Sequence, residues 1–587
     1  MRARFPLPAA LCAAIGLPFA APAAWADSPV VIEGADKEAR QAILDLLPDR
    51  EAPDSLFDAE RIAEEAAARA LAWLRSEGYY GATVTPEASD EPPAARLVIA
   101  LGPRFTFEAP EIVYAGAAPE ADALGAASAA LAPVSQAAPA RAAAVLEAEG
   151  AALSALQQHG YADAAAGERR VVVDHATGRV AVTFHFNAGA AARLGALQAE
   201  PGGVLRPGFL EDLRNWDYGD AYTPQALARL RRDITSTGAV SSASTRLEPA
   251  DASGVRDVVL SIEPAHRNAY ELGLSYSTTE GAGVQAEWTR RNLTGRADAL
   301  TVAGTLAEMQ QSARVELTRP HAAGLGHAAT FGASAEHETL DAYTRQGLAL
   351  YASVNASTRL RTATSYGVRL SGDTYDDLAG GVRNAAVLSG FADVRHDTTE
   401  FSLDPRDGAI TELRIEPSVS TGDETLAFVR ATAEARIYES FGKDDRLTIA
   451  ARGRAGWLEA LSGDVNDVPP DRRFYAGGGG SVRGYVYNSI YPAERDLAGL
   501  SPGGQGLAEA SAEARLRFAS RWGAAAFVDG GTAFDVWEDA GDLSWGAGIG
   551  LRYDLGFAPL RFDIAFPLDE DETNADYALY ISIGQAF

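Results

Sequence analysis

Residues 543–555 read LSWGAGIGLRYDL, and apolar or aromatic side chains occupy every second position of this stretch. Ser, Gly, Arg and Asp fill the positions between them. Successive side chains of a β-strand point to opposite faces, so a strand of this sequence has one apolar and one polar face. The stretch therefore predicts a strand that separates an apolar environment from a polar one.

The same alternation recurs from about residue 265 onward, for example in residues 270–276 and 560–566. Aromatic residues lie at or near the ends of these stretches, and Gly, Ser and charged residues occupy the opposite face. This composition suits a barrel with a lipid-facing exterior and a wet lumen. The ~320 residues of this part, at roughly 20 per strand with its turn, allow about 16 antiparallel strands. We therefore predict an all-β transmembrane barrel over residues 265–587, with a water-soluble β-sandwich as the alternative.

The first and last strands are expected to close this barrel. Phe587 fits a final strand that pairs with the first strand around Tyr270. A glycine near the end of the last strand would weaken the closure, because glycine has no side chain to pack. The expected seam residues are Tyr270, Leu272, Leu274 and Tyr276 of the first strand, and Leu579, Ile581, Ile583, Gly584 and Phe587 of the last.

Residues 473–485 read RFYAGGGGSVRGY, a glycine-rich loop that brings one arginine and one aromatic residue to a fixed place. A P-loop is excluded because no Gly-Lys-Ser/Thr follows the glycines. A nucleophile elbow is excluded because Arg483 occupies the last glycine position of G-x-S-x-G. An arginine fork suits carboxylates, and an unpaired charge in a narrow lumen is costly. The polar faces of two later strands supply the candidate partners Glu513 and Asp529, and Phe527 shares a face with Asp529.

Residues 28–264 contain three segments in which a helix ends at a glycine and two strands follow. The glycines are Gly78, Gly160 and Gly238, and their spacing of about 80 residues suits tandem small domains. Each lies where a helix C-cap needs a positive φ. The repeated unit is an α+β domain of the order β-α-α-β-β. The predicted domains cover residues 28–103, 104–189 and 190–264.

The N-terminus and the composition restrict the compartment and the ligands. Arg2 and Arg4, an apolar stretch and Ala24-Trp25-Ala26 predict a secretory signal peptide over residues 1–26. The single cysteine, Cys12, lies inside it, so the exported chain would have no disulfide or thiolate metal site. A net charge of −29, from 80 Asp+Glu against 51 Lys+Arg, argues against nucleic-acid binding. Beyond residue 26 the sequence contains no run of ~18 apolar residues, so no membrane-spanning helix is expected.

These motifs resemble those of a known family. Val482-Arg483-Gly484-Tyr485 is similar to the V-R-G-[F/Y] signature of the BamA-like outer-membrane assembly superfamily, which lies in a loop that folds back into the barrel. Phe527-x-Asp529 and the strand with Glu513 resemble its partner strands, and Asp404-Pro405 to Gly408 resembles its D-P-x-x-G element. The β-α-α-β-β modules resemble POTRA domains. Three modules favour the TamA branch, the outer-membrane subunit of the translocation and assembly module, because other branches carry more or fewer.

The resemblance implies an assembly and translocation factor in the bacterial outer membrane, with its N-terminal domains in the periplasm. Client β-barrel proteins such as autotransporters would be inserted or secreted through a lateral seam between the first and last strands, in contact with outer-membrane lipid. The implied partner is a TamB-like (AsmA-like) protein anchored in the inner membrane. No cofactor, nucleotide or metal is implied.

Three alternatives stay open. A two-partner-secretion-type pore would need a lumen that is open at rest. The barrel could instead be the outer-membrane end of a lipid-transport bridge, because AsmA-like partners resemble lipid carriers. Arg483 could brace the barrel without any part in gating, since charge pairs in a lumen are often structural. An enzyme is not expected, because the sequence has no H-E-x-x-H and no readable nucleophile–base pair.

Overall fold

The computed structural model describes residues 30–587, except residue 49 and residues 358–360, 378–380, 423–424 and 570–574. The predicted signal peptide, residues 1–26, lies outside the described residues. The chain divides into two compact units. One extends to Ala192 and includes Ala221–Pro224, and the other consists of Arg193–Asp220 and Gln225–Phe587.

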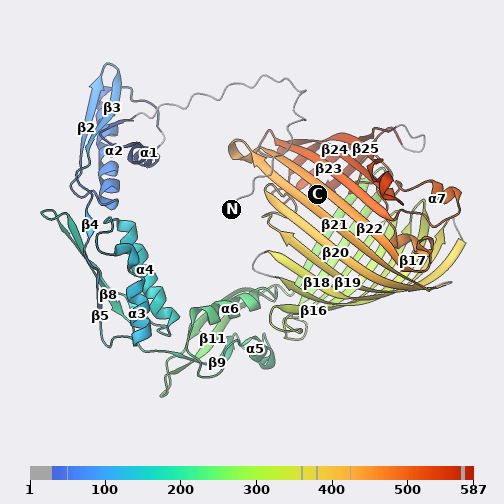
Figure 1. The fold of residues 1–587 in the computed structure, drawn as a ribbon, viewed down its shortest axis with the longest axis horizontal. Helices are drawn as coiled ribbons and strands as arrows, with labels where there is room; N and C mark the ends of the chain where they lie inside the picture. Colours follow the sequence, from blue (N-terminus) through green and yellow to red (C-terminus); the bar gives the residue numbers. More distant parts are fainter. Residues whose placement is uncertain (1–29, 49, 358–360, 378–380, 423–424, 570–574) are drawn as a thin grey trace. The chain divides into compact units, whose positions relative to one another are not determined.

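The first module is a three-stranded sheet with two helices on one face (Figure 1). Its middle strand is parallel to one neighbour and antiparallel to the other, in the order β1-β3-β2. Ile43, Leu74 and Leu97 are fully buried in one apolar cluster between the helices and the sheet. The elements are β1 (Val30–Glu33), α1 (Lys37–Asp45), α2 (Leu56–Ser76), β2 (Thr83–Asp90) and β3 (Pro93–Ala100).

The second module is built around β8, which pairs with four shorter strands. Its helices carry many alanines, and Ala127, Ala148 and Ala152 are fully buried in its core. Such small side chains let neighbouring backbones pack closely. The elements are β4 (Thr106–Phe107), β5 (Glu111–Tyr114), α3 (Ala121–Ala129), η1 (Ala132–Val134), α4 (Ala142–Gln158), β6 (Ala165–Ala166), β7 (Arg170–Asp174) and β8 (Arg179–Asn187).

The third module repeats the arrangement of the first, with its strands in the order β10-β11-β9. Its elements are β9 (Arg193–Glu200), α5 (Pro207–Leu213), α6 (Pro224–Thr235), β10 (Val240–Leu247) and β11 (Val255–Pro264). Gly78, Gly160 and Gly238 follow the second long helix of their modules at φ of 96°, 99° and 69°. All three φ angles are positive, as the sequence predicts for glycines at helix C-caps. The prediction of tandem POTRA-like α+β modules is confirmed.

The described residues of the rest of the chain form one closed barrel of sixteen strands in sequential order, each antiparallel to its neighbours (Figure 1). The predicted strand number is confirmed. The strands are β12 (Asn268–Ser277), β13 (Gly281–Arg291), β14 (Ala299–Ala307), β15 (Gln310–Arg319), β16 (His327–Thr339), β17 (Tyr343–Ser357), β18 (Thr362–Asp377), β19 (Gly381–Asp397), β20 (Gly408–Thr421), β21 (Thr425–Phe441), β22 (Leu447–Ser462), β23 (Gly506–Arg517), β24 (Trp522–Phe534), β25 (Ser544–Asp554), β26 (Pro559–Pro567) and β27 (Ala578–Ile583).

Because the number of strands is even, β12 begins and β27 ends at the same end of the barrel. This end, to which the third module is joined, is called the module end, and the opposite one the far end. The turn between β12 and β13 and the segment between β22 and β23 lie at the far end. The turns between β19 and β20, between β21 and β22, between β23 and β24 and between β25 and β26 lie at the module end.

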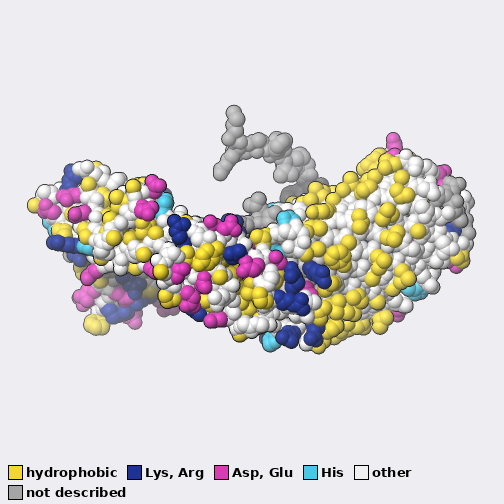
Figure 2. Space-filling model, turned by 90° about the horizontal axis from the view of Figure 1, so that it is seen from below, with side chains coloured by type: hydrophobic (Ala, Val, Ile, Leu, Met, Phe, Trp, Pro, Cys, Tyr) yellow, Lys and Arg dark blue, Asp and Glu magenta, His cyan; other side chains and the backbone are white. Residues whose placement is uncertain are grey.

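The outer wall of the barrel is apolar. Figure 2 shows that wall as a broad area of hydrophobic and uncharged surface. Leu272, Leu350 and Ile549 are 69%, 62% and 64% exposed on it. So large an exposed apolar band suits contact with lipid and not with water. None of the helices in the described part of the chain is long and apolar enough to cross a membrane, and this finding does not concern strands.

The barrel closes at a different place from the one expected. Only Ser275, Tyr276 and Ser277 of β12 have Cα partners on β27, whereas ten residues of β12 pair with β13. The closure is therefore centred on Tyr276 and not on Tyr270. Phe587 is also outside the final strand, which ends at Ile583. The reason is Gly584, whose φ of 95° turns the backbone out of the extended conformation.

Candidate functional site: the lumen loop and the seam

The segment between β22 and β23, residues 463–505, enters the barrel; we call it the lumen loop. Its side chains Val482, Arg483 and Tyr485 are 0%, 1% and 3% exposed. Val482 belongs to an apolar cluster that includes residues of β22, β23 and β24. The hydroxyl of Tyr485 donates to the Asp569 carboxylate over 2.7 Å. The loop therefore occupies the barrel interior.

Gly484 has to be a glycine at this place. Its φ is 107°, a conformation that L side chains rarely adopt. A Cβ atom here would lie 2.8 Å from the backbone nitrogen of Pro567 and 3.0 Å from the carbonyl carbon of Phe566. The glycine thus lets the loop backbone approach the far end of β26.

Arg483 is held by carboxylates from three strands. Its Nε donates to Oδ2 of Asp529 over 2.6 Å and its Nη2 donates to Oδ1 of the same residue over 3.0 Å. Its Nη1 donates to Glu513 over 2.8 Å and to Asp563 over 3.4 Å. The guanidinium carbon lies 3.4 Å from the centre of the Phe527 ring. A two-pronged ion pair of this kind fixes both position and orientation.

Further arginines complete the cluster. Arg515 donates to Glu513 over 2.9 Å, Arg552 donates to Glu513 over 3.1 Å and also bonds Asp563, and Arg561 lies 3.5 Å from Asp563. All of these side chains are buried. Burial alone lowers the pKa of the Arg483 guanidinium, but the hydrogen bond and the charges of Asp529, Glu513 and Asp563 raise the pKa above its ordinary value. Four arginines and three carboxylates are thus paired with one another in this cluster.

The sequence reasoning brought Arg483, Glu513, Phe527 and Asp529 together, and the structure places them in contact. It missed Asp563, although this residue lies on the polar face of residues 560–566. The alternation of polar and apolar residues that singled out Asp529 could have singled out Asp563 as well.

The lumen loop also contacts both sides of the seam. The backbone N–H of Gly479 donates to Glu280 in the turn after β12 over 2.6 Å. The backbone N–H of Gly484 donates to the hydroxyl of Tyr580 on β27 over 3.1 Å. Thr279, beside Glu280, donates to the same hydroxyl over 3.4 Å. The loop therefore fastens the two closing strands to each other at the far end.

A second anchor holds the loop to the opposite wall. Asp471 accepts a hydrogen bond of 2.7 Å from Tyr375 on β18 and lies 3.5 Å from Arg345 on β17. Arg472 lies 3.3 Å from Glu416 on β20. Burial alone raises the pKa of Asp471, but Arg472 and Arg345 outweigh it and hold the pKa below its usual value. The loop thus ties both halves of the barrel together.

The expected seam residues fall into two groups. Tyr276 and Ile581 face each other in the seam itself, and Leu579 accepts from the backbone N–H of Thr278 over 3.0 Å. Tyr270, Leu272 and Leu274 pair with β13 alone, and Ile583 pairs with β26 alone. The seam is therefore closed at its far end and open toward the module end.

The chain beyond the seam turns into the barrel. The backbone N–H of Gly584 donates to the Pro559 carbonyl over 2.8 Å, and that of Gln585 to the Leu403 carbonyl over 3.1 Å. Phe587 is 9% exposed and packs inside the barrel with Tyr438. The last strand consequently offers no further partner to β12 among the described residues.

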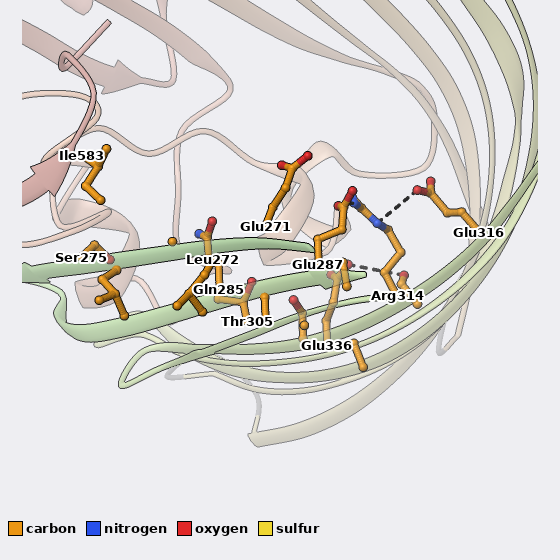
Figure 3. A pocket seen from close by; sticks show the side chains of 18 of the residues that line it. Glu271, Leu272, Ser275, Gln285, Glu287, Thr305, Arg314, Glu316, Glu336 and Ile583 are labelled. Atoms are coloured by element: carbon orange, nitrogen blue, oxygen red, sulfur yellow. Dashed lines mark hydrogen bonds and ion pairs between the residues drawn. The ribbon is translucent and has the colours of Figure 1, made fainter. Parts of the chain in front are cut away.

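A cavity of about 900 Å³ lies along the open part of the seam (Figure 3). Its inner wall is polar, and Arg314 bridges Glu287 at 3.1 Å and Glu316 at 3.3 Å. Leu272 of β12 and Ile583 of β27 also line it. The cavity therefore joins a polar lumen to an apolar edge. In the described ranges, no group of three or more His, Cys, Asp or Glu side chains is placed to hold a metal ion.

Together these features define an outer-membrane β-barrel protein that carries POTRA-like modules and a loop anchored in its lumen. Residues 292–587, half of the chain, match the Omp85 superfamily domain, and the chain belongs to this superfamily. It is 26% identical over 397 residues to the outer membrane protein assembly factor BamA of Nitratidesulfovibrio vulgaris. That alignment covers 64% of this chain and 49% of the relative, so the chain spans about half the length of that protein.

The structure agrees with the sequence match. The crystal structure of BamA from Haemophilus ducreyi lacking POTRA domains 1–3 covers 82% of this chain and all of that one, with a TM-score of 0.66 at 16% identity. The barrel therefore lies in the outer membrane and the POTRA-like modules lie in the periplasm. The module end is periplasmic and the far end extracellular. Proteins of this family are not enzymes, as the sequence predicts.

Proposed function

We propose that this protein inserts client β-barrel proteins into the outer membrane through the seam between β12 and β27. The observation that carries the proposal is the short closure, three residue pairs against ten between β12 and β13. Fewer backbone hydrogen bonds have to break to part β12 from β27 than to part β12 from β13. So short a seam is the easiest place at which the barrel can part.

The open part of β12 is also the natural place for a client strand. Residues 268–274 pair with β13 and, within the described residues, with no strand on their other side. Unpaired N–H and C=O groups are very unfavourable in a bilayer, because no water is there to satisfy them. A client strand that adds to this edge would satisfy them, as in other cases of strand addition.

The three modules support an assignment to the TamA branch of the superfamily. In that case the clients include autotransporters, and a TamB-like (AsmA-like) protein anchored in the inner membrane delivers them or acts with them. POTRA-like modules provide exposed sheet edges for such partners, for instance β2. Outer-membrane lipid contacts the apolar wall.

A second function is favoured by the cavity beside the seam. A polar wall and an apolar opening in one space suit an amphiphile, so the barrel could form the outer-membrane end of a lipid-transport bridge. A two-partner-secretion-type pore is less consistent with the structure, because the lumen loop occupies the barrel interior.

Cysteine crosslinking tests the insertion proposal. Ser275 and Ser582 face each other across the seam, and the only cysteine of the chain is Cys12 in the predicted signal peptide. We expect a Ser275→Cys, Ser582→Cys disulfide to stop insertion of a client barrel into liposomes until reductant is added.

The matched control is Leu272→Cys with Ala286→Cys, a pair that joins β12 to β13 without crossing the seam. This disulfide should leave client insertion unchanged. Insertion that continues with the seam locked would exclude the seam as the route and favour lipid transport.

A further inference from the structure

The periplasmic end of the barrel contains a small cavity with an unusual charge. Its volume is about 50 Å³, and strand ends and turns from β19 to β26 line it, together with Gln585. Six arginines and two aspartates are among the lining residues, whereas the whole chain has 80 acidic against 51 basic residues. The arginines are Arg406, Arg446, Arg515, Arg517, Arg521 and Arg552.

Two of these arginines are fully engaged inside the barrel. Arg515 bonds Glu513 and the carbonyls of Pro405 and Phe587. Arg552 bonds Glu513, Asp563 and Gln585. Their side chains are fixed by these bonds and form a wall that continues into the Arg483 cluster.

The other four keep donors to spare. Two of the three nitrogens of Arg406 donate to Asp404, at 3.1 and 2.9 Å. Arg517 donates from Nη2 alone, to backbone carbonyls of the turn between β21 and β22. Arg521 donates from Nη1 to Tyr553 at 3.5 Å, and Arg446 lies 3.8 Å from Asp444. Among the described residues, Nη1 of Arg406 and Nε and Nη1 of Arg517 have no acceptor.

Aromatic residues place the cavity at the level of lipid headgroups. Trp522 lines it and is 42% exposed on the outer wall of the barrel. Its ring meets that of Tyr553 edge to face, with the ring centres 4.8 Å apart. Aromatic girdles of this kind mark the membrane–water interface of outer-membrane barrels. Trp522 thus places this side of the cavity near the level of the phosphates of the periplasmic leaflet.

We propose that this arginine-lined cavity binds a phosphate group. Its size exceeds the 10–15 Å³ or so that one water needs and suits a small tetrahedral anion. Arginine forks are well matched to phosphate oxygens. The phosphate can come from a phospholipid of the periplasmic leaflet or from phosphate in solution. This site is separate from the seam and does not depend on the proposed insertion function.

The test is a titration of the purified full-length protein in a nonionic detergent with three probes, followed by calorimetry. The probes are inorganic phosphate, dihexanoyl phosphatidylglycerol and dihexanoyl glycerol, which has no phosphate. Phosphate and phosphatidylglycerol should bind and compete with each other, and dihexanoyl glycerol should not bind. Phosphatidylglycerol that binds at least tenfold more tightly than phosphate identifies a lipid as the ligand. Equal affinities identify phosphate in solution.

The variant Arg446→Gln, Arg521→Gln removes two exposed turn arginines and should weaken both ligands at least tenfold. Arg406→Gln is a second variant for the case that the double variant fails to fold. The matched control is Arg319→Gln, an exposed arginine at the same end of the barrel outside the cavity. The proposal is overturned if neither phosphate-containing probe binds the natural protein, or if folded cavity variants bind as tightly as the control.

Discussion

The backbone N–H of Gly479 in the lumen loop lies 2.6 Å from the Glu280 carboxylate, which it contacts by a hydrogen bond. Glu280 stands in the turn that follows β12, while Gly484 of the same loop bonds Tyr580 on β27. One loop therefore touches both strands that must separate if the seam opens. The lumen loop and the seam are therefore in direct contact, although their residues are far apart in sequence.

Removal of the Glu280 carboxylate should loosen the seam. A hydrogen bond to a charged group contributes about 1.5–3 kcal/mol, which corresponds to about a tenfold change or more in an open–closed equilibrium. We expect Glu280→Ala to raise about tenfold the rate of amide hydrogen exchange at Thr278, whose backbone N–H donates to the Leu579 carbonyl across the seam. Asp341→Asn, in an exposed turn between β16 and β17, is the control. An unchanged rate would mean that this contact of the lumen loop does not hold the seam closed.

Loss of the arginine of the lumen loop should destabilise the barrel itself. Arg483→Ala leaves Asp529, Glu513 and Asp563 buried with less compensation, and breaking a buried pair costs about 3–5 kcal/mol. Arg483→Lys keeps a charge but loses the two-pronged bond to Asp529 and should have a smaller effect. The unfolding midpoint, read from heat-modifiable mobility in gels, ranks the three proteins. Equal midpoints for natural protein and Arg483→Ala would show that the cluster contributes nothing to stability.

The two glycines with positive φ at the loop and at the seam should respond differently to alanine. At Gly584 the substitution introduces only backbone strain, because the nearest atom to a new Cβ is 3.6 Å away; the left-handed conformation costs about 1–2 kcal/mol. At Gly484 the strain is joined by contacts at 2.8 and 3.0 Å with the backbone of β26. Gly484→Ala should therefore lower the unfolding midpoint more than Gly584→Ala, and the reverse order would contradict this account of the loop.

Much of the architecture could be predicted from the alternation of side chains. The pattern of residues 543–555 specifies a strand with one wet face, and its recurrence specifies the barrel. Arg483 and Asp529 could be paired in advance because a buried arginine needs a carboxylate and the polar face of a strand supplied one.

The closure of the barrel could not be predicted in the same way. The alternation of side chains assigns residues to the two faces of a strand but does not fix the register between two strands. The sequence therefore did not decide whether the last strand pairs with the first around Tyr270 or around Tyr276. The end of β27 depends on the φ of Gly584, which the sequence permits without requiring. Asp471 also escaped notice, because one carboxylate among 80 acidic residues carries no signal until its arginine partners are known.

The second anchor of the lumen loop provides a prediction with a defined pH dependence. Asp471→Asn removes the charge opposite Arg345 and Arg472 and should lower the unfolding free energy by about 3 kcal/mol. The folded pKa of Asp471 lies below its unfolded value, so the carboxylate stabilises the fold fully above about pH 4 and loses this effect as the pH falls further. The difference in unfolding free energy between the natural protein and Asp471→Asn should therefore be the same at pH 8 and at pH 5, and it should shrink below pH ~4. Asp467→Asn, exposed in the same loop, should show no such difference at any pH. A deficit that already fades between pH 8 and pH 5 would mean that another titrating group holds the loop.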